Sequence, residues 1–304
     1  MTSAAHHRDV AQGSFRQRYN VDPQVKIQKL KTNSPELTDA ARPATFVVPA
    51  INEHGETIDT PIAGEHALTL YVDKEEILTI MTLGAAPEAL ALGYLRNQRL
   101  LDSIDDVLAV QVDWNVDAVV VKTRNGIRDL AGKTAKRTKT SGCGQGTVFG
   151  DLMQDIDNVR LPKDVRLKQS TLYDLLNKVR LHETIYKQAG AVHGCALATN
   201  GNDASEILYF VEDVGRHNAV DAIAGLMWLD RVEGSDKIFY TTGRLTSEMV
   251  IKAAQMGIPF LVSRSGLTQM GYDIAQKVGI TMIGRATNRH YLLFTGAEQF
   301  DRDG

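Results

Sequence analysis

The second half of the chain constrains the fold most, because helical and strand patterns alternate from residue 170 to the end. Gly257 and Gly279 follow two of the expected helices, at positions where a C-cap glycine belongs. Alternating helices and strands predict a layered α/β domain in which helices cover a sheet. The expected helices are 170–188, 218–232, 246–256 and 271–278, and the expected strands are 191–199, 206–213, 237–241, 258–263, 280–284 and 291–295.

The first half predicts a smaller α+β domain over residues 45–132. Pro87 stands at the start of an apolar helical segment, where proline is favourable. Residues 1–44 are polar and lack periodicity, so we expect a flexible, disordered tail. We expect a mobile cysteine loop over 133–150 and the α/β domain over 151–304. A chain of this length can form one large domain or two with separate cores. Alternating patterns predict strands at 67–73, 76–81, 107–112 and 118–123.

Charge and cysteine content exclude several classes of protein. The net charge of −3 argues against a nucleic-acid binder. No apolar stretch suits a membrane span or a signal peptide, so we expect a cytoplasmic protein that does not enter a membrane. The two cysteines, Cys143 and Cys195, are too few for a disulfide framework or a four-cysteine zinc site.

Cys143 is the candidate nucleophile. It lies between Gly142 and Gly144, which leave the thiol uncovered, and it follows a basic segment that starts at Lys133. Nearby cations favour the thiolate, which is the reactive form. These features suit a thiol that accepts a sulfur atom and passes it on, although an incidental cysteine in a surface loop remains an equal alternative. Cys195 has apolar neighbours and is expected to be buried.

Three polar segments follow predicted strands, where open α/β sheets bind ligands. The segments are EDVGRHNAVD at 212–221, TGRLTSEM at 242–249 and GRATNRH at 284–290. Arg216, His217 and Arg244 could hold a phosphate, while Asn218 and either Thr246 or Ser247 could cap the following helices. The alternatives are a salt-bridged turn, simple helix capping and a polar hairpin. His193, in an apolar strand, is either a hydrogen-bonded core residue or a side chain that points into the same crevice.

Four segments together resemble the formate dehydrogenase accessory sulfurtransferase family, FdhD/NarQ. EDVGRHNAVD at 212–221 matches the family's most recognisable segment, and TTGRLTSEMVIKAAQMGIPFLVSRS at 241–265 is similar to its next block. LGAAPEALALGYL at 83–95 and SGCG at 141–144 resemble its first helix and its cysteine loop. The resemblance covers residues from about 45 to 300.

This resemblance implies a sulfur carrier that takes persulfide sulfur from a cysteine desulfurase. The sulfur is passed to the molybdenum (or tungsten) bis(guanine dinucleotide) cofactor, bound as a substrate, for formate dehydrogenase or a related molybdoenzyme. No permanent cofactor is expected. The larger domain is expected to be similar to the cytidine deaminase fold, and the protein to be a homodimer. Cys143 falls on the persulfide cysteine. The residues that fall on the cofactor-binding segment are Arg285, Ala286, Thr287, Asn288, Arg289 and His290.

Departures from the family pattern leave one alternative open. Gly146 stands where the family has a second cysteine, which could supply two electrons by closing a disulfide. Arg285 replaces an aromatic residue common in the cofactor segment. The alternative is a non-catalytic chaperone that holds the cofactor. A zinc-dependent deaminase has little support, because the chain lacks the His-x-Glu and Pro-Cys-x-x-Cys ligands.

Overall fold

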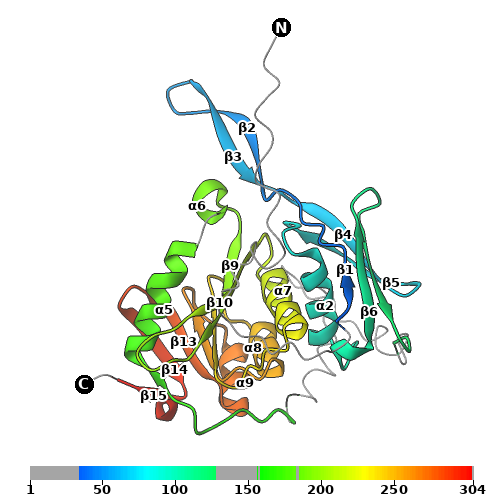
Figure 1. Ribbon diagram of the computed structural model, residues 1–304. Helices are drawn as coiled ribbons and strands as arrows, with labels where there is room; N and C mark the ends of the chain where they lie inside the picture. Colours follow the sequence, from blue (N-terminus) through cyan, green and yellow to red (C-terminus); the bar gives the residue numbers. More distant parts are fainter. Residues whose placement is uncertain (1–33, 128–155, 157, 183–184, 303–304) are drawn as a thin grey trace.

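The computed structural model describes residues 34–127, 156, 158–182 and 185–302, which form two large sheets, two sheets of two strands each, and helices packed around them (Figure 1). Cys143 and the whole of the predicted cysteine loop over 133–150 lie outside these residues. The mixed α/β fold is confirmed, while the similarity to cytidine deaminases stays a prediction. Among the described residues, no helix has the length and apolar character that crossing a membrane requires.

The first sheet has five strands in the order β1-β6-β7-β4-β5. Its four long strands and α2 (Pro87–Asn97) agree with the sequence prediction. β1 (Glu36–Leu37) pairs in parallel with β6, so the tail predicted for 1–44 is wrong at these residues. Apolar periodicity does not reveal a strand of two residues. The long strands are β4 (His66–Val72), β5 (Glu75–Thr82), β6 (Val107–Asp113) and β7 (Ala118–Thr123).

A two-stranded hairpin that the sequence did not predict projects from the body of the protein (Figure 1). It consists of β2 (Thr45–Ile51) and β3 (Thr57–Ala63), which pair only with each other. Pro49 and Pro61 interrupt its two edges, where proline protects an unpaired strand from further pairing. The prolines and the absence of alternation hid this hairpin in the sequence.

The second sheet has six strands in the order β10-β9-β11-β12-β13-β14. β9 runs antiparallel to β10 and β11, and β12 and β13 continue in parallel with β11. The carboxyl ends of β10, β11, β12 and β13 therefore meet at one edge. The strands are β9 (His193–Thr199), β10 (Ile207–Asp213), β11 (Lys237–Thr241), β12 (Phe260–Ser263), β13 (Thr281–Thr287) and β14 (His290–Thr295).

Helices cover both faces of this sheet, as the alternating pattern predicted. α7 (Arg216–Leu229), α8 (Ser247–Gln255) and α9 (Gln269–Val278) pack with one core, and α5 (Gln169–His182) packs with the other. The single helix predicted for 170–188 is wrong, because a break separates α5 from α6 (Ile185–Ala189). Two short strands, β8 (Leu167–Lys168) and β15 (Phe300–Asp301), pair beside α5.

One hydrophobic core includes residues of both halves, whereas the division of the chain into two domains stays a prediction. α2 of the first half packs against α7 of the second at very short range. A Cβ atom at Gly93 would lie 1.6 Å from the carbonyl oxygen of Asp221, and one at Gly225 would lie 1.9 Å from that of Ala89. Only glycine permits this backbone approach. Elsewhere, Gly257 (φ 75°) and Gly279 (φ 80°) adopt the left-handed conformation predicted after their helices.

Candidate functional site

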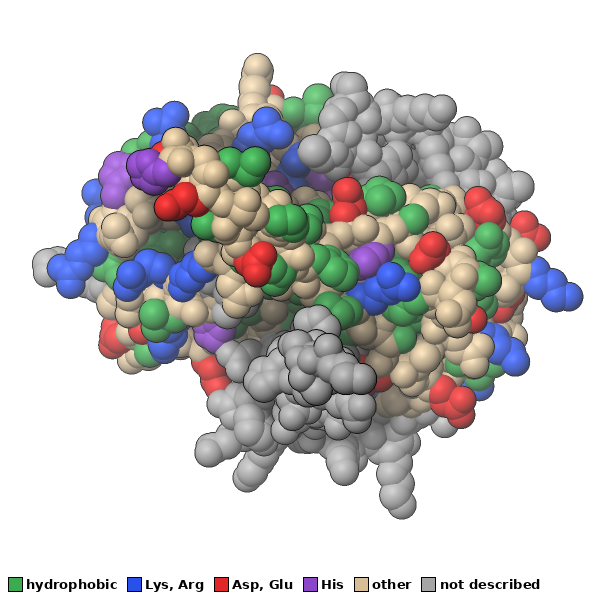
Figure 2. Space-filling view, turned by 90° about the horizontal axis from the view of Figure 1, so that it is seen from above, with side chains coloured by type: hydrophobic (Ala, Val, Ile, Leu, Met, Phe, Trp, Pro, Cys, Tyr) green, Lys and Arg blue, Asp and Glu red, His purple; other side chains and the backbone are tan. Residues whose placement is uncertain are grey.

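The candidate site lies at the edge where the parallel strands of the six-stranded sheet end. Arg216, Arg244 and Arg264 each come within three residues of the end of one of these strands, and β9 begins at this edge with His193. Figure 2 views the protein from this side and shows blue Lys and Arg side chains with purple His on the left, around hollows in the surface. The topology of the sheet therefore brings together basic residues that are far apart in the sequence.

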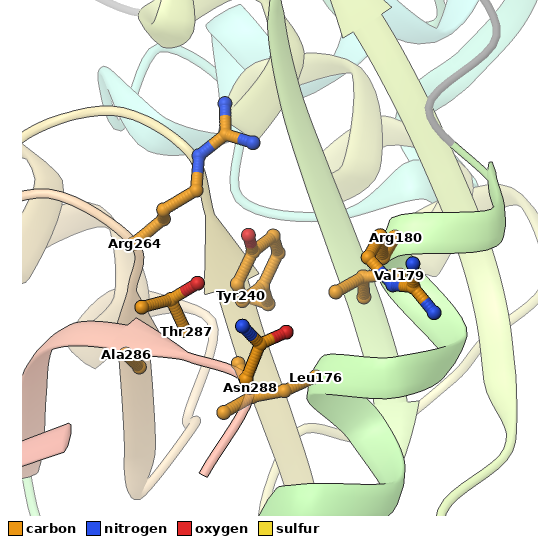
Figure 3. Close-up of a pocket in the computed structure, with 8 residues that line it drawn as sticks. All are labelled: Leu176, Val179, Arg180, Tyr240, Arg264, Ala286, Thr287 and Asn288. Carbon is orange, nitrogen blue, oxygen red and sulfur yellow. The ribbon is translucent and has the colours of Figure 1, made fainter. Parts of the chain in front are cut away.

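A pocket at this edge lies between the sheet and α5 (Figure 3). Tyr240 lies on β11 and Arg264 directly follows β12, and Arg180 lies across from them on α5. Tyr240 is almost fully buried, so its ring forms part of the wall. The lining residues are Leu176, Val179, Arg180, Tyr240, Arg264, Ala286, Thr287 and Asn288.

Half of the predicted cofactor segment lines this pocket, namely Ala286, Thr287 and Asn288. Arg285 lies beside it in a left-handed conformation (φ 50°), and its backbone N–H donates to the carbonyl oxygen of Ser265 at 2.8 Å. A left-handed conformation is uncommon for a residue with a side chain and often marks a functional site.

The rest of the segment points elsewhere. The guanidinium of Arg289 lies 5.8 Å from the ring centroid of Tyr173 on α5, and the Tyr173 hydroxyl donates to the carbonyl oxygen of Arg289. These two contacts hold the turn between β13 and β14 against α5. His290 is exposed at the start of β14. The sequence thus identified the pocket-lining segment, although Arg289 and His290 do not line the pocket.

His193 lies among the positively charged arginine side chains at this edge. Burial lowers the pKa of its imidazole, and the nearby guanidinium groups of Arg216, Arg244 and Arg264 lower it further. The guanidinium groups of these three arginines therefore lie near the His193 imidazole, and the alternative that His193 points into the crevice stays a prediction. An anion bound among these groups would be attracted to the arginines and would favour protonation of the imidazole.

Arg264 is held in place by neighbouring elements. Its guanidinium lies 5.1 Å from the ring centroid of Tyr186 on α6. The α6 backbone is fixed in turn, because the N–H groups of Ile185 and Tyr186 both donate to the carboxylate of Glu212 at 3.0 Å. The backbone N–H of Arg264 donates to the carbonyl oxygen of Thr241. Glu212 thus serves to position the wall of the pocket.

Asp213 fixes the turn that carries Arg216. Its buried carboxylate accepts hydrogen bonds from the hydroxyl of Thr82, from the backbone N–H groups of Leu83 and Gly215, and from the amide of Asn218. Thr82 is the last residue of β5 and Leu83 follows it, so this carboxylate links the first half of the chain to the site. The prediction that Asn218 caps α7 is wrong, because Gly215 occupies the N-cap position.

A buried network explains most of the other charged residues in the segments 212–221 and 242–249. Lys252 and Asp221 form a fully buried ion pair with an N–O distance of 2.8 Å. His217 lies 3.2 Å from the carboxylate of Glu248, so the prediction that His217 faces a phosphate is wrong. For these residues the simpler interpretation, a salt-bridged structural turn, holds. Thr246 occupies the N-cap of α8, as predicted, but its side chain makes no capping hydrogen bond.

The structure describes Cys195 but not Cys143. Cys195 is fully buried in β9, as predicted, and its thiol donates to the hydroxyl of Thr241 at 3.3 Å. Burial raises the pKa of this thiol to about 12, so it is not a nucleophile near neutral pH. Cys143 lies outside the described residues, and its predicted reactivity stays a prediction. Within the described part of the chain, no group of His, Cys, Asp and Glu could hold a metal ion.

Sequence reasoning did not single out Arg180, Tyr240 or Arg264. Arg264 could have been found, because it directly follows a predicted strand at the same edge as Arg216 and Arg244. Arg180 and Tyr240 carry no such signal. Their place in the pocket depends on how α5 packs across the sheet.

The fold and the site define an α/β protein with a cationic pocket at the carboxyl edge of its main sheet. The model of the FdhD/NarQ family matches residues 63–301, and the chain belongs to that family. A relative from Sulfurisphaera tokodaii, named sulfur carrier protein FdhD, is 32% identical over 252 residues, which are 82% of this chain and 94% of the relative. A relative of the same name from Wolinella succinogenes is 27% identical over 237 residues, covering 78% and 81%.

A solved structure supports the fold. It is described as a formate dehydrogenase accessory protein from Desulfotalea psychrophila, and its TM-score with this chain is 0.68 at 24% identity. The match covers 85% of this chain and 100% of the solved one. The arrangement of sheets and helices is therefore that of a known fold.

Proposed function

We propose that this protein is a sulfur carrier that accepts persulfide sulfur on Cys143 and delivers it to a molybdenum or tungsten bis(guanine dinucleotide) cofactor. The donor is a cysteine desulfurase, and the cofactor serves formate dehydrogenase or a related molybdoenzyme. Membership of the FdhD/NarQ family and the names of the relatives support the sulfur carrier role. The proposal includes a cytoplasmic location and a homodimer.

The observation that carries the cofactor part of the proposal is the cationic pocket at the strand ends. Ala286, Thr287 and Asn288 form one wall, with Arg180 and Arg264 on the other sides. A guanine dinucleotide brings diphosphate groups, which guanidinium groups bind through paired N–H donors. A polar wall next to a buried aromatic ring suits a ligand that has both a charged and a planar part.

The sulfur transfer uses ordinary thiol chemistry. The Cys143 thiolate attacks the terminal sulfur of the donor persulfide, a new S–S bond forms on Cys143, and the donor cysteine leaves as a thiolate. Delivery of the carried atom as sulfide needs two electrons. Gly146 stands where the family has a second cysteine, so the electrons come from an external thiol that ends as a disulfide with Cys143.

A loading experiment with the full-length chain tests this proposal. The protein is incubated with a cysteine desulfurase and labelled cysteine, and the label is located by peptide mass spectrometry. We expect label on Cys143 and none in the Cys143→Ser variant. Cys195→Ser is the matched control and should load normally, because Cys195 is buried. Equal loading of the Cys143→Ser variant would overturn the proposal.

The second candidate is a non-catalytic chaperone that holds the cofactor for insertion. Gly146 favours it, because the chain lacks the local thiol that would complete the transfer. A chaperone would carry no label on Cys143 in the loading experiment, although it would still bind guanine nucleotide in a separate titration.

A further inference from the structure

Arg216 carries a positive charge that nothing in the described structure neutralises. Its side chain is only 8% exposed, and its Nε atom is buried without a hydrogen-bond partner in the part of the chain that the structure describes. None of the ion pairs among the described residues includes it. A guanidinium cannot release its proton in a protein, and burying an unpaired charge is expensive. A bound anion would therefore stabilise this guanidinium group.

The surroundings of Arg216 hold it in this position. A Cβ atom at Gly243 would lie 2.8 Å from Cδ of Arg216, so the glycine makes room for the arginine stem. Asp213, which lies three residues before Arg216 in the sequence, forms no ion pair with it within the described part of the chain. Its carboxylate accepts four hydrogen bonds, from Thr82, Leu83, Gly215 and Asn218. The charge is thus built into the fold by a glycine and by a carboxylate engaged with other donors.

Two helix N-termini lie at the same edge. α7 begins at Arg216 itself, and its N-cap residue Gly215 has no side chain to cap it. The N-cap of α8, Thr246, makes no side-chain capping bond, and its hydroxyl is buried without a partner among the described residues. The first turns of both helices therefore place their positive dipole ends at this edge, where they favour an anion.

We propose that Arg216, together with His193, Arg244 and Arg264, forms an oxyanion-binding centre that takes a phosphate or diphosphate group. The buried Arg216 binds the anion from inside the protein. The more exposed Arg244 and Arg264 bind it from the side of the pocket. This inference rests on the proposed function only for the source of the anion, which is then the diphosphate of the nucleotide cofactor. The anion-binding site itself is inferred only from the described residues and does not depend on the proposed sulfur transfer.

Calorimetric titration of inorganic diphosphate into the full-length protein tests the centre. Arg216→Gln keeps a polar side chain without the charge and should weaken binding about tenfold or more, as expected for losing a charged hydrogen-bond donor. The matched control is Arg231→Gln, just beyond the other end of α7, where the arginine pairs with Asp105. It removes the same charge and should leave binding within about twofold.

Diphosphate binding by Arg216→Gln that equals the wild type overturns the centre, as does a wild type that binds no diphosphate. Titrations with orthophosphate and GDP distinguish the two sources of the anion. Tighter binding of GDP than of diphosphate assigns the centre to a nucleotide, and equal binding assigns it to a free anion.

Thermal unfolding without ligand gives a second, independent readout. Replacing an arginine with a purely structural role lowers the stability of the protein. Replacing a buried arginine that has no ion-pair partner does not. We expect Arg216→Gln to melt at or above the wild-type temperature in phosphate-free buffer. We also expect added diphosphate to raise the melting temperature of the wild type only. A substantially less stable Arg216→Gln variant without ligand would overturn the assignment.

The pH dependence of binding tests the place of His193. The arginines keep their charge, and Asp213, which faces His193 across the ladder, is engaged with its four donors. Burial and the arginines lower the pKa of His193 in the free protein, and a bound anion raises it, so binding takes up a proton. Sulfate, whose charge is constant, should bind more tightly at about pH 6 than at about pH 8. His193→Gln should abolish that difference, and a variant with the wild-type pH dependence removes His193 from the centre.

These outcomes are separate from the proposed sulfur transfer. Loading of label on Cys143 does not require the anion centre, so Arg216→Gln should still load. A protein that binds diphosphate through Arg216 but never loads keeps the centre and loses the proposed function.

Discussion

Replacement of Lys252 by methionine should be among the most destabilising single substitutions in this protein. The Lys252 ammonium lies 2.8 Å from the Asp221 carboxylate, and neither side chain is exposed. At an effective dielectric constant of about 20, attraction over that distance is about 6 kcal/mol, much of which offsets the cost of burying both charges. Lys252→Met removes the attraction and leaves the buried Asp221 carboxyl without its partner, a loss of about 3–5 kcal/mol in the free energy of unfolding.

Urea unfolding at neutral pH, followed by circular dichroism, measures this loss. The Asp221→Asn substitution keeps the shape of the side chain and its contact with Asn97, which donates to Asp221 at 2.7 Å. The double variant Lys252→Met/Asp221→Asn should therefore be less destabilised than the sum of the single variants by about 2 kcal/mol or more. A loss below about 1 kcal/mol for Lys252→Met, or strict additivity in the double variant, would refute this reasoning.

Three further predictions concern packing, the pocket and the buried thiol. Gly225→Ala should destabilise the protein by about 3 kcal/mol or more in urea unfolding, because the added methyl would overlap a carbonyl of α2, whereas Gly266→Ala should change stability by less than about 0.5 kcal/mol. Tyr186→Leu should weaken GDP binding about threefold in calorimetry by releasing the Arg264 guanidinium from its aromatic contact, and unchanged affinity would contradict this. Cys195 should resist iodoacetamide in the native protein at about pH 8 and react only after unfolding, because burial raises the pKa of its thiol to about 12; rapid native alkylation would contradict the described burial.

The sequence predicted those parts of the fold that depend on local pattern. Strands such as β4 and helices such as α2 follow from alternation, apolar periodicity and a well-placed proline. The hairpin of β2 and β3 was missed because its strands contain proline and threonine and bury no face of their own. The shared core was also missed, because the contact between α2 and α7 depends on Gly93 and Gly225, whose meaning appears only when the helices cross.

The candidate site was predicted as segments but not as a geometry. The rule that ligands bind beyond the carboxyl ends of parallel strands selected Arg216 and Arg244 correctly as residues at that edge. It could not separate Arg216, which lies near His193, from the adjacent His217, which pairs with Glu248 in the core. Neighbours in a helix point in different directions, so this distinction depends on the rotation of α7 against the sheet.

The position of Arg180 illustrates what three-dimensional packing adds. It lies on a helix that reads as an ordinary amphipathic segment in the sequence. Only the packing of α5 on the outer face of the sheet places Arg180 opposite Arg264. Long-range contacts of this kind leave no trace in spacing or composition.

Transfer of labelled sulfur from Cys143 to the cofactor of a molybdoenzyme tests the central claim most directly. Protein loaded by a cysteine desulfurase and freed from excess label is mixed with formate dehydrogenase that lacks the sulfur on its metal, in the presence of a thiol. The account predicts that label leaves Cys143 and appears on the enzyme's cofactor as formate oxidation activity rises, with Cys195→Ser behaving as the wild type. Full activation by Cys143→Ser, with no label transferred, would contradict it.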